Sequence, residues 1–401
     1  MSLCKNYEIK DKKMVYDIAI IGAGPAGMAL ACSFAKSKIK IAIVEKKSKK
    51  SLDNPEYDGR EIALTNRSIE ILKNIGVWNK IPKKILSPIK EAWVLNGSSK
   101  YCLDFKHRQI QKESLGYIVP NNIIKKYLYS IVKSQKNVKL YNGKNLESIN
   151  PDTKKFSSIN LSNGKKIKAT LIIASDGRFS KARTMTGIST FNHNFNKNMI
   201  VCRMKHEKSH KNIAYEFFRY SQTQAALPCV KKQSSIVTTV PKQTSSFLMK
   251  MNDKNFNKEM EKSFNNYFGK MKLISKRHSY PMVTIYSKQF IKNRFALIGD
   301  AAVGMHPVTA HGFNLSLQGV DLLKREIDNA IKKNIDFGLP NILRKYQYKF
   351  HRIAAPLYFG TNGIVNLFSN NSGPAKIARE FILKTVNTIK PIKQAFLEVL
   401  K

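Results

Sequence analysis

Two histidines and an aspartate lie close together in the segment 298–314, which reads IGDAAVGMHPVTAHGFN. His306 and His311 are five residues apart, and Asp300 precedes both. Imidazole and carboxylate groups at such spacing could bind a metal ion or transfer protons. No cysteine or further group of carboxylates stands beside them at ligand spacing, and glycines in the segment let a ligand approach the backbone. We therefore expect no metal here, and a loop that holds a large ligand.

A second histidine pair, His206 and His210, matches the H-E-x-x-H pattern of zinc proteases. That pattern works only on a helix, where both imidazoles face one metal ion. The segments 199–207 and 212–228 are rich in β-branched and aromatic residues, and the residues between them are polar. The sequence therefore predicts two strands joined by a polar hairpin, and no zinc site.

The segment 16–48 contains the parts of a nucleotide-binding unit in the required order. An apolar run at 17–21 predicts a buried strand, and GAGPAG follows it at 22–27. A helix over 28–38 and a second strand over 39–44 complete the unit. This order favours a Rossmann-like fold that binds a dinucleotide.

Each residue type in this turn has a physical reason. Gly22 permits the tight turn, Gly24 lets backbone amides approach a pyrophosphate, and Gly27 lets the helix pack against the strand. Ala26 belongs to the same turn, just before the helix whose N-terminus attracts phosphate. Glu45 ends the second strand, where a carboxylate can accept hydrogen bonds from a ribose. The unit alone leaves open whether the cofactor is FAD or NAD.

Length and composition bound the class of protein. A chain of 401 residues is too long for one ordinary core, so two domains are expected. No apolar run approaches the roughly 20 residues that a spanning helix needs, and the N-terminal residues lack the apolar region of a secretory signal. The five cysteines lie far apart without C-x-x-C, which favours reduced thiols. We expect a cytoplasmic protein.

The net charge of +43 has three interpretations. Lysine, asparagine and isoleucine are all abundant, as the codons of an AT-rich genome would produce, and we favour this interpretation. Attraction to an anionic membrane surface is the second, and binding to nucleic acid is the third. Because the basic residues are spread along the chain rather than gathered in one arm, we expect no nucleic-acid partner.

Three sequence blocks stand in a recognisable order: the turn at 22–27, LIIASDGRFSKAR at 171–183, and the block from 294 to 327 that contains Asp300. Together they resemble the flavin-dependent aromatic hydroxylases, the group of para-hydroxybenzoate hydroxylase. The motifs DGREIALTNRS, VLNG, VPN and VCRMKHE are similar to the ubiquinone-biosynthesis hydroxylases, and most of all to the UbiM branch. The resemblance covers most of the chain, except the residues beyond about 345.

The resemblance implies an α/β fold in which a Rossmann-like FAD-binding domain is interleaved with a smaller β-sheet substrate domain, followed by a helical C-terminal region. The expected segments are, in that order, 1–92, 118–187 and 288–345 for the FAD domain, 93–117 and 188–287 for the substrate domain, and 346–401 for the C-terminal region.

The resemblance also assigns roles in binding FAD. It implies that the turn and Glu45 hold the ADP half of the cofactor, and that Arg60 lies along the flavin and its phosphates. Asn121 would be a polar flavin contact. The Asp-Gly block is tied to the pyrophosphate and to reduction, and the Gly-Asp block to the ribityl chain. The residues of these two blocks are Asp176, Gly177, Gly299 and Asp300.

The segment 307–314 would form the loop at the flavin ring. Gly312 would bring the backbone close to the ring, and Phe313 and Asn314 begin the helix that follows. Pro307 stiffens the turn. His311 departs from the glycine or glutamine common in relatives, so it either tunes reduction and proton transfer at the flavin edge or only packs the loop.

The implied activity is hydroxylation of a polyprenylated phenol or benzoquinol on the way to ubiquinone. NAD(P)H would reduce FAD, O₂ would add to it as a hydroperoxide, and an oxygen atom would pass to the ring. We favour the C5 position, that of a 5-demethoxyubiquinol-type hydroxylase. A ubiquinone-biosynthesis complex and the inner face of the plasma membrane are expected partners. A prenyl-lipid reductase, a flavoprotein that modifies RNA, and a protein that binds FAD without catalysis remain alternatives.

Overall fold

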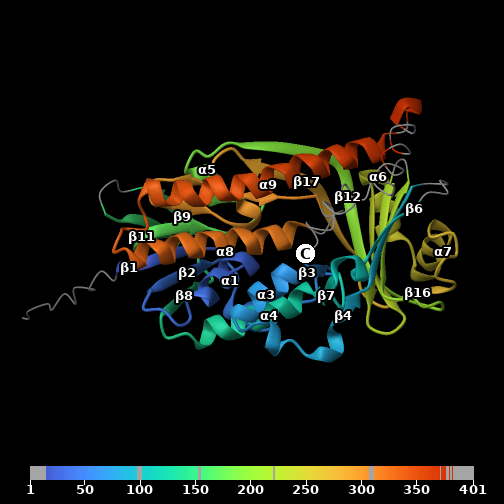
Figure 1. Cartoon of the computed structure of the whole chain (residues 1–401), viewed down its shortest axis with the longest axis horizontal. Helices are drawn as coiled ribbons and strands as arrows, with labels where there is room; N and C mark the ends of the chain where they lie inside the picture. Colours follow the sequence, from blue (N-terminus) through green and yellow to red (C-terminus); the bar gives the residue numbers. More distant parts are fainter. Residues whose placement is uncertain are drawn as a thin grey trace, which may run out of the picture.

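The computed structural model describes residues 15–96, 102–151, 155–219, 222–306, 311–370, 372–375, 379 and 382. In these residues it contains an eight-stranded, a nine-stranded and a three-stranded sheet. Figure 1 shows the eight-stranded sheet at one end of the molecule, the nine-stranded sheet at the other and the small sheet between them.

The eight-stranded sheet has the order β18-β19-β11-β1-β2-β8, and β10 and β9 extend from β11 as an antiparallel meander. Its central strands pair in parallel and are buried almost throughout, because helices cover both faces. The strands are β1 (Val15–Ile21), β2 (Ile41–Glu45), β8 (Val138–Asn142), β9 (Leu146–Asn150), β10 (Ser157–Leu161), β11 (Lys166–Ala174), β18 (Ile291–Lys292) and β19 (Phe295–Leu297).

This sheet confirms the predicted Rossmann-like unit, with one correction. The helix after the turn, α1, spans Pro25–Ser33, so it starts earlier and ends earlier than the predicted 28–38. Proline occupies the first turn, where its missing N–H costs nothing, and this allows the earlier start. The other helices near this sheet are α2 (Lys49–Asp53), α3 (Asn66–Asn74), α4 (Asn121–Ser134) and α5 (Lys181–Met185).

The nine-stranded sheet, called the large sheet below, has the order β20-β17-β12-β15-β14-β13-β5-β6, with β16 paired to β12. Helices α6 (Lys242–Lys250) and α7 (Asp253–Ser263) contribute to an apolar core on one of its faces. The strands are β5 (Glu91–Asn96), β6 (Cys102–Lys106), β12 (Thr190–His206), β13 (Ile213–Arg219), β14 (Gln222–Cys229), β15 (Gln233–Pro241), β16 (Met271–Leu273), β17 (His278–Ser287) and β20 (Val303–Gly304).

The large sheet confirms one prediction and corrects another. Phe256, Met260, Phe264 and Phe268, expected to pack in a core, are all buried in its apolar cluster. The strands on either side of the 206–210 segment exist, but they do not form a hairpin. Strands β15 and β14 lie between β12 and β13 in the sheet, because β12 pairs with β15, β16 and β17. A polar segment between two strands predicts a turn without showing which strands pair.

The three-stranded sheet joins β3 (Glu61–Thr65), β7 (Gly116–Pro120) and β4 (Ser87–Ile89). Short 3₁₀ helices lie in the connections between helices and strands. They are η1 (Trp78–Lys80), η2 (Lys83–Ile85), η3 (His107–Ile110) and η4 (Gly299–Ala301).

Two long helices, α8 (His311–Lys332) and α9 (Pro340–Ser369), run side by side along the molecule (Figure 1). A Cβ on Gly319 would lie 2.9 Å from the ring of Phe350, so glycine is what lets the two helices pack this closely. Tyr346 belongs to the same core cluster as the Rossmann-like sheet, whereas Phe368 packs on Phe218 of β13. Helix α9 therefore contacts both the Rossmann-like sheet and the large sheet. The predicted division of the chain into domains stays a prediction.

Candidate functional site

The glycine turn lies at the carboxyl end of β1, where β11 also ends. Gly22 has φ +101°, and a Cβ there would lie 2.7 Å from the carbonyl oxygen of Ser175. A Cβ on Gly27 would lie 2.2 Å from the carbonyl oxygen of Gly22. The Ser175 hydroxyl donates to that same oxygen at 2.8 Å. Only glycine fits at these two positions, so the turn leaves its backbone and the α1 N-terminus open to a ligand.

Glu45 braces this turn from the end of β2. Its buried carboxylate accepts one hydrogen bond from Ala23 N at 2.7 Å and another from Lys47 N at 2.9 Å. Each carboxylate oxygen can accept a second hydrogen bond, so the group can still take a hydroxyl donor from a ligand.

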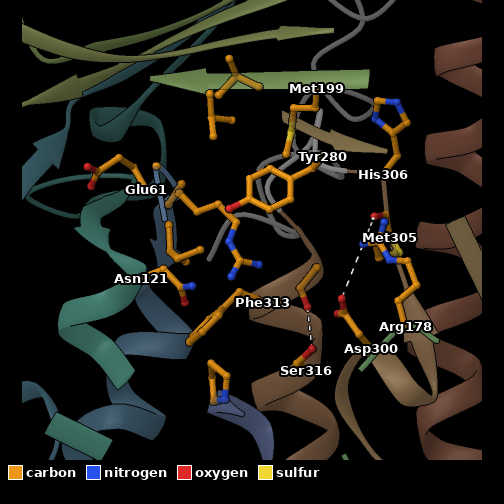
Figure 2. Close-up of a pocket in the computed structure, with 18 of the residues that line it drawn as sticks. Glu61, Asn121, Arg178, Met199, Tyr280, Asp300, Met305, His306, Phe313 and Ser316 are labelled. Carbon is orange, nitrogen blue, oxygen red and sulfur yellow. Dashed lines mark hydrogen bonds and ion pairs between the residues drawn. The ribbon is translucent and has the colours of Figure 1, made fainter. Parts of the chain in front are cut away.

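One cavity of about 510 Å³ joins the glycine turn to the large sheet. Figure 2 shows Met199 and Tyr280 of the large sheet on one side, and Phe313, Ser316 and Asp300 on the other. The predicted residues that line it are Gly24, Ala26, Arg60, Asn121, Gly177, Asp300, Gly312 and Phe313. Segments more than 200 residues apart in the sequence thus meet in one cavity.

The edge of the cavity beneath α8 is set by a close packing of Gly299 on Ala26. Gly299 has φ +62°, and a Cβ on it would lie 2.8 Å from that of Ala26. Asp300 follows on η4, with its side chain 41% exposed and 3.5 Å from Nη2 of Arg178. Its carboxylate is therefore available to a ligand in the cavity.

Asn314 does not line the cavity. Its amide Nδ2 donates to Ala63 O at 2.8 Å, and its Oδ1 accepts from Thr65 N at 3.0 Å. The side chain therefore ties the first turn of α8 to β3. This fixes the backbone of Gly312 and Phe313 beside the cavity, so we now propose a positioning role for Asn314.

In the Asp-Gly block, too, one residue holds the local structure while its neighbours line the cavity. The carboxylate of Asp176 accepts hydrogen bonds from the Ser180 hydroxyl at 2.5 Å and from Ala182 N at 3.1 Å, which holds the start of α5. Gly177 and Arg178 line the cavity. Arg178 donates to carbonyl oxygens of residues 283 and 305, so it also links this block to the large sheet.

Asp58 is a functional candidate that the sequence did not reveal. Its Oδ2 accepts hydrogen bonds from Arg60 Nη2 at 2.6 Å, Asn121 Nδ2 at 2.8 Å and Lys125 Nζ at 2.9 Å. Burial acts to raise the pKa of the Asp58 carboxyl, but Arg60 and Lys125 outweigh it and hold the pKa below its usual range. One carboxylate oxygen thus orients three donors, two of them predicted cofactor contacts. The motif Asp58-Gly59-Arg60 was the only feature of the sequence that pointed to Asp58.

A buried ion pair joins the small sheet to the large one beside the cavity. Glu61 of β3 pairs with Arg203 of β12, and the Tyr57 hydroxyl donates to Glu61 Oε1 at 3.0 Å. The Arg203 guanidinium also lies over the Tyr57 ring, 5.4 Å from its centroid. Glu61 and Arg203 are 142 positions apart, so their contact could not be predicted from the sequence.

Both histidines of the opening segment are held neutral. Burial is the main cause that lowers the pKa of His306 from 6.5 to about 3, and the charges of Arg178 and Lys197 add to it. Burial also lowers the pKa of His311 to about 4. His306 lines the cavity and His311 begins α8. Pro307 lies outside the described residues.

The second histidine pair does not lie on a helix, because His206 ends β12 and His210 lies in the loop before β13. Nε2 of His206 lies 3.0 Å from the Ser234 hydroxyl, and Nε2 of His210 lies 2.8 Å from Cys229 O. Within the described part of the chain, no group of three or more His, Cys, Asp or Glu side chains is placed to hold a metal ion.

The neutral histidines predict a loss of stability in mild acid. The unfolded chain binds a proton on His306 as the pH falls through about 6.5, whereas the folded protein does so only near pH 3. The free energy of unfolding should therefore fall from pH 7 to pH 5, with about 2 kcal/mol of the loss due to His306. Urea unfolding at pH 7, 6 and 5 measures this.

The variant His306→Gln should lose less stability over that range than the unchanged protein. His107→Gln, on η3 away from the cavity, is the matched control and should keep the full slope. Equal slopes for all three proteins would contradict a buried neutral His306.

Comparison with known proteins places this geometry in a family. Residues 15–357 match the family model described as FAD binding domain. The ubiquinone hydroxylase UbiM of Neisseria meningitidis is 39% identical over 98% of this chain and 85% of its own. The ubiquinone hydroxylase UbiL of Rhodospirillum rubrum is 28% identical, over 96% of this chain and 89% of its own.

Solved structures show the same fold. The p-nitrophenol 4-monooxygenase PnpA from Pseudomonas putida superposes with a TM-score of 0.76, at 13% identity, over 96% of this chain and 98% of its own. The fold and the predicted UbiM branch are thus confirmed. The chain belongs to the FAD binding domain family, in the branch of the ubiquinone hydroxylase UbiM, and is an FAD-dependent monooxygenase.

Proposed function

We propose that the protein hydroxylates the aromatic ring of a polyprenylated phenol or benzoquinol in ubiquinone biosynthesis, at C5, with O₂ and with NAD(P)H as electron donor. One observation carries the proposal furthest. A single cavity joins the glycine turn to a largely apolar sheet wall, so a cofactor and an apolar ring can lie in contact there. The similarity to UbiM along nearly the whole chain supports the substrate class.

The residues present fit FAD. The turn excludes every side chain at Gly22 and Gly27, which leaves its amides free for the pyrophosphate. Glu45 would take a ribose hydroxyl, Asp300 the ribityl chain, and Arg60 an anionic group. When bound and reduced, FAD supplies the activated oxygen that no side chain can provide.

The protein's own groups position and shield the reaction. The N-terminal end of α8 lies at the cavity, where its amides and positive dipole end stabilise negative charge. The neutral imidazole of His311 can donate or accept a hydrogen bond there without adding charge, and we propose this role for it at the flavin edge. Apolar residues of the large sheet exclude water from the ring.

The three donors held by Asp58 should contribute to FAD binding. Replacing Asp58 by Ala releases Arg60, Asn121 and Lys125, and loss of such charge-assisted hydrogen bonds should weaken FAD affinity by about 10-fold or more. Titration of the apoprotein with FAD, followed by quenching of flavin fluorescence, measures this change.

Asp53→Ala is the matched control. It breaks another ion pair between an aspartate and an α4 lysine, Lys133, in which the lysine side chain is 50% exposed and the aspartate side chain 34% exposed. This control should bind FAD as the unchanged protein does. If Asp58→Ala also binds FAD with unchanged affinity, Asp58 does not orient the cofactor contacts.

Complementation tests the activity. Bacterial strains that each lack one ubiquinone hydroxylase would receive this chain, and quinone intermediates would be identified by mass spectrometry. We expect ubiquinone to return in the strain blocked at C5. If ubiquinone returns only in a strain blocked at another position, the enzyme hydroxylates that ring carbon instead of C5. If ubiquinone returns in none of the strains, the proposed hydroxylase activity is contradicted. Saturable, salt-sensitive tRNA binding would instead favour the RNA-modifying alternative.

We also propose that the outer face of α9 rests on an anionic membrane, where a polyprenyl substrate dissolves. Tyr348, Arg352 and Phe359 recur at helical spacing on that helix, and the two aromatic rings are 65% and 54% exposed. Phe359 contacts Phe191, which lies beneath the ammonium group of Lys288. No described helix is long and apolar enough to cross a bilayer.

Vesicle binding tests this surface. Because the opposite face of α9 is part of the core, deleting the helix would unfold the protein, so point variants are needed. The double variant Tyr348→Ser and Phe359→Ser should reduce sedimentation with phosphatidylglycerol vesicles several-fold. Tyr267→Ser, an exposed tyrosine after α7, is the control. Undiminished sedimentation of the double variant would contradict the membrane surface.

A further inference from the structure

The cavity face of the large sheet is lined by small and apolar side chains, with a single carboxyl among them. Each strand places every second residue on this face, and the pairing register determines which of these residues lie side by side on adjacent strands. Its members include Val201, Leu227, Ala225, Val237 and Thr239. Among the described residues that this sheet contributes to the lining, Glu216 of β13 is the one acid.

The residues next to Glu216 in the sheet are apolar, so they cannot compensate a negative charge on its carboxylate. Val94 of β5 and Ala225 of β14 are its partners across the two adjoining strands. Ala214 and Phe218 flank it on the same face of β13, since side chains alternate along a strand. Among the residues that the structure describes, no hydrogen bond or ion pair involves the Glu216 carboxyl. It is half-buried, and it lines the cavity.

A second carboxyl of the cavity shows the contrast. Glu61 is bound to Arg203 and to the Tyr57 hydroxyl, so its charge is compensated within the protein. Burial without a partner raises the pKa of Glu216 well above its usual range, which makes it a neutral group with one O–H to donate. A buried polar group without a partner costs free energy, and such groups are normally satisfied by a ligand or by water.

We propose that Glu216 binds the substrate, and that its carboxyl donates a hydrogen bond to an uncharged oxygen atom on the substrate ring. This inference rests on the proposed function, because that function brings an oxygen-bearing ring into the cavity. A hydroxyl, methoxy or quinone oxygen is a suitable acceptor. The rest of the wall is mostly apolar. Among the described residues, its other polar side-chain groups are the Thr223 and Thr239 hydroxyls and the Tyr280 hydroxyl, which donates to Asp58 O at 2.7 Å.

Two substitutions separate hydrogen bonding from packing. Glu216→Gln keeps an N–H donor in nearly the same shape, whereas Glu216→Leu removes the donor. Replacing an unpartnered carboxyl by an apolar group should leave the protein at least as stable, so Glu216→Leu should fold and retain FAD. Glu147→Leu makes the same change on an exposed position of β9 and is the matched control.

Binding is measured by the change in flavin absorbance when the oxidised holoenzyme is titrated with a short-chain ubiquinol precursor. We expect Glu216→Leu to raise Kd, and KM in turnover, by about 10-fold, with a smaller change in kcat. Glu216→Gln should stay within about 3-fold of the unchanged enzyme, as Glu147→Leu should. Unchanged Kd and KM in Glu216→Leu would overturn the proposal.

Ring analogues that lack one oxygen at a time give an independent result. The analogue without the bound oxygen should bind the unchanged enzyme and Glu216→Leu equally, whereas the other analogues should still show the difference. The same loss for every analogue would overturn the proposal. If the unchanged holoenzyme binds these rings but hydroxylates none, the proposed function fails while the titration still decides the role of Glu216.

Discussion

The structure depends on the close approach of two strand ends, β1 and β11, at Gly22 and Ser175. The backbone there is so crowded that a Cβ on Gly22 or Gly27 would overlap carbonyl oxygens. This crowding points the amides of the turn and the N-terminus of α1 at one spot. Gly299 then packs on Ala26, which brings the end of β19 and the start of α8 to the same spot. The cofactor position that we propose is therefore a consequence of backbone packing rather than of any one charged side chain.

The cavity exists because the large sheet faces the glycine turn. Two arginines hold it there. Arg203 pairs with Glu61 of the small sheet. Arg178, just after the end of β11, donates to one backbone oxygen of β17 and to the backbone oxygen of Met305. Helix α9 adds apolar packing to both sheets. The cavity between these contacts has polar groups on the cofactor side and a mostly apolar wall on the substrate side, which suits an uncharged ring beside a dinucleotide.

The predictable part of this site was local. The turn and its flanking strands follow from residue types at short spacing, and the structure confirms them. The role of the Gly-Asp block came instead from the resemblance to the flavin-dependent hydroxylases. Side-chain partners at long range were not predictable. Asp58 and Lys125 are 67 positions apart, and Glu61 and Arg203 are 142 positions apart, so only the tertiary fold brings each pair together. The same limit produced the wrong hairpin at 206–210, since strand pairing is set by the whole sheet. The side-chain amide of Asn314 is bonded to β3, which its place in a motif did not reveal, and its predicted contact with the cofactor stays a prediction.

The central claim is that this cavity brings an aromatic ring to oxygen activated on FAD. The most direct measurement supplies the purified holoenzyme with NAD(P)H, a short-chain ubiquinol precursor and ¹⁸O₂, and determines the product by mass spectrometry. If the protein is a hydroxylase, each product molecule carries one ¹⁸O atom on its ring, and none when the label is carried by water. Oxidation of NAD(P)H with an altered ring that contains no ¹⁸O would identify a reductase instead and contradict hydroxylation in this cavity.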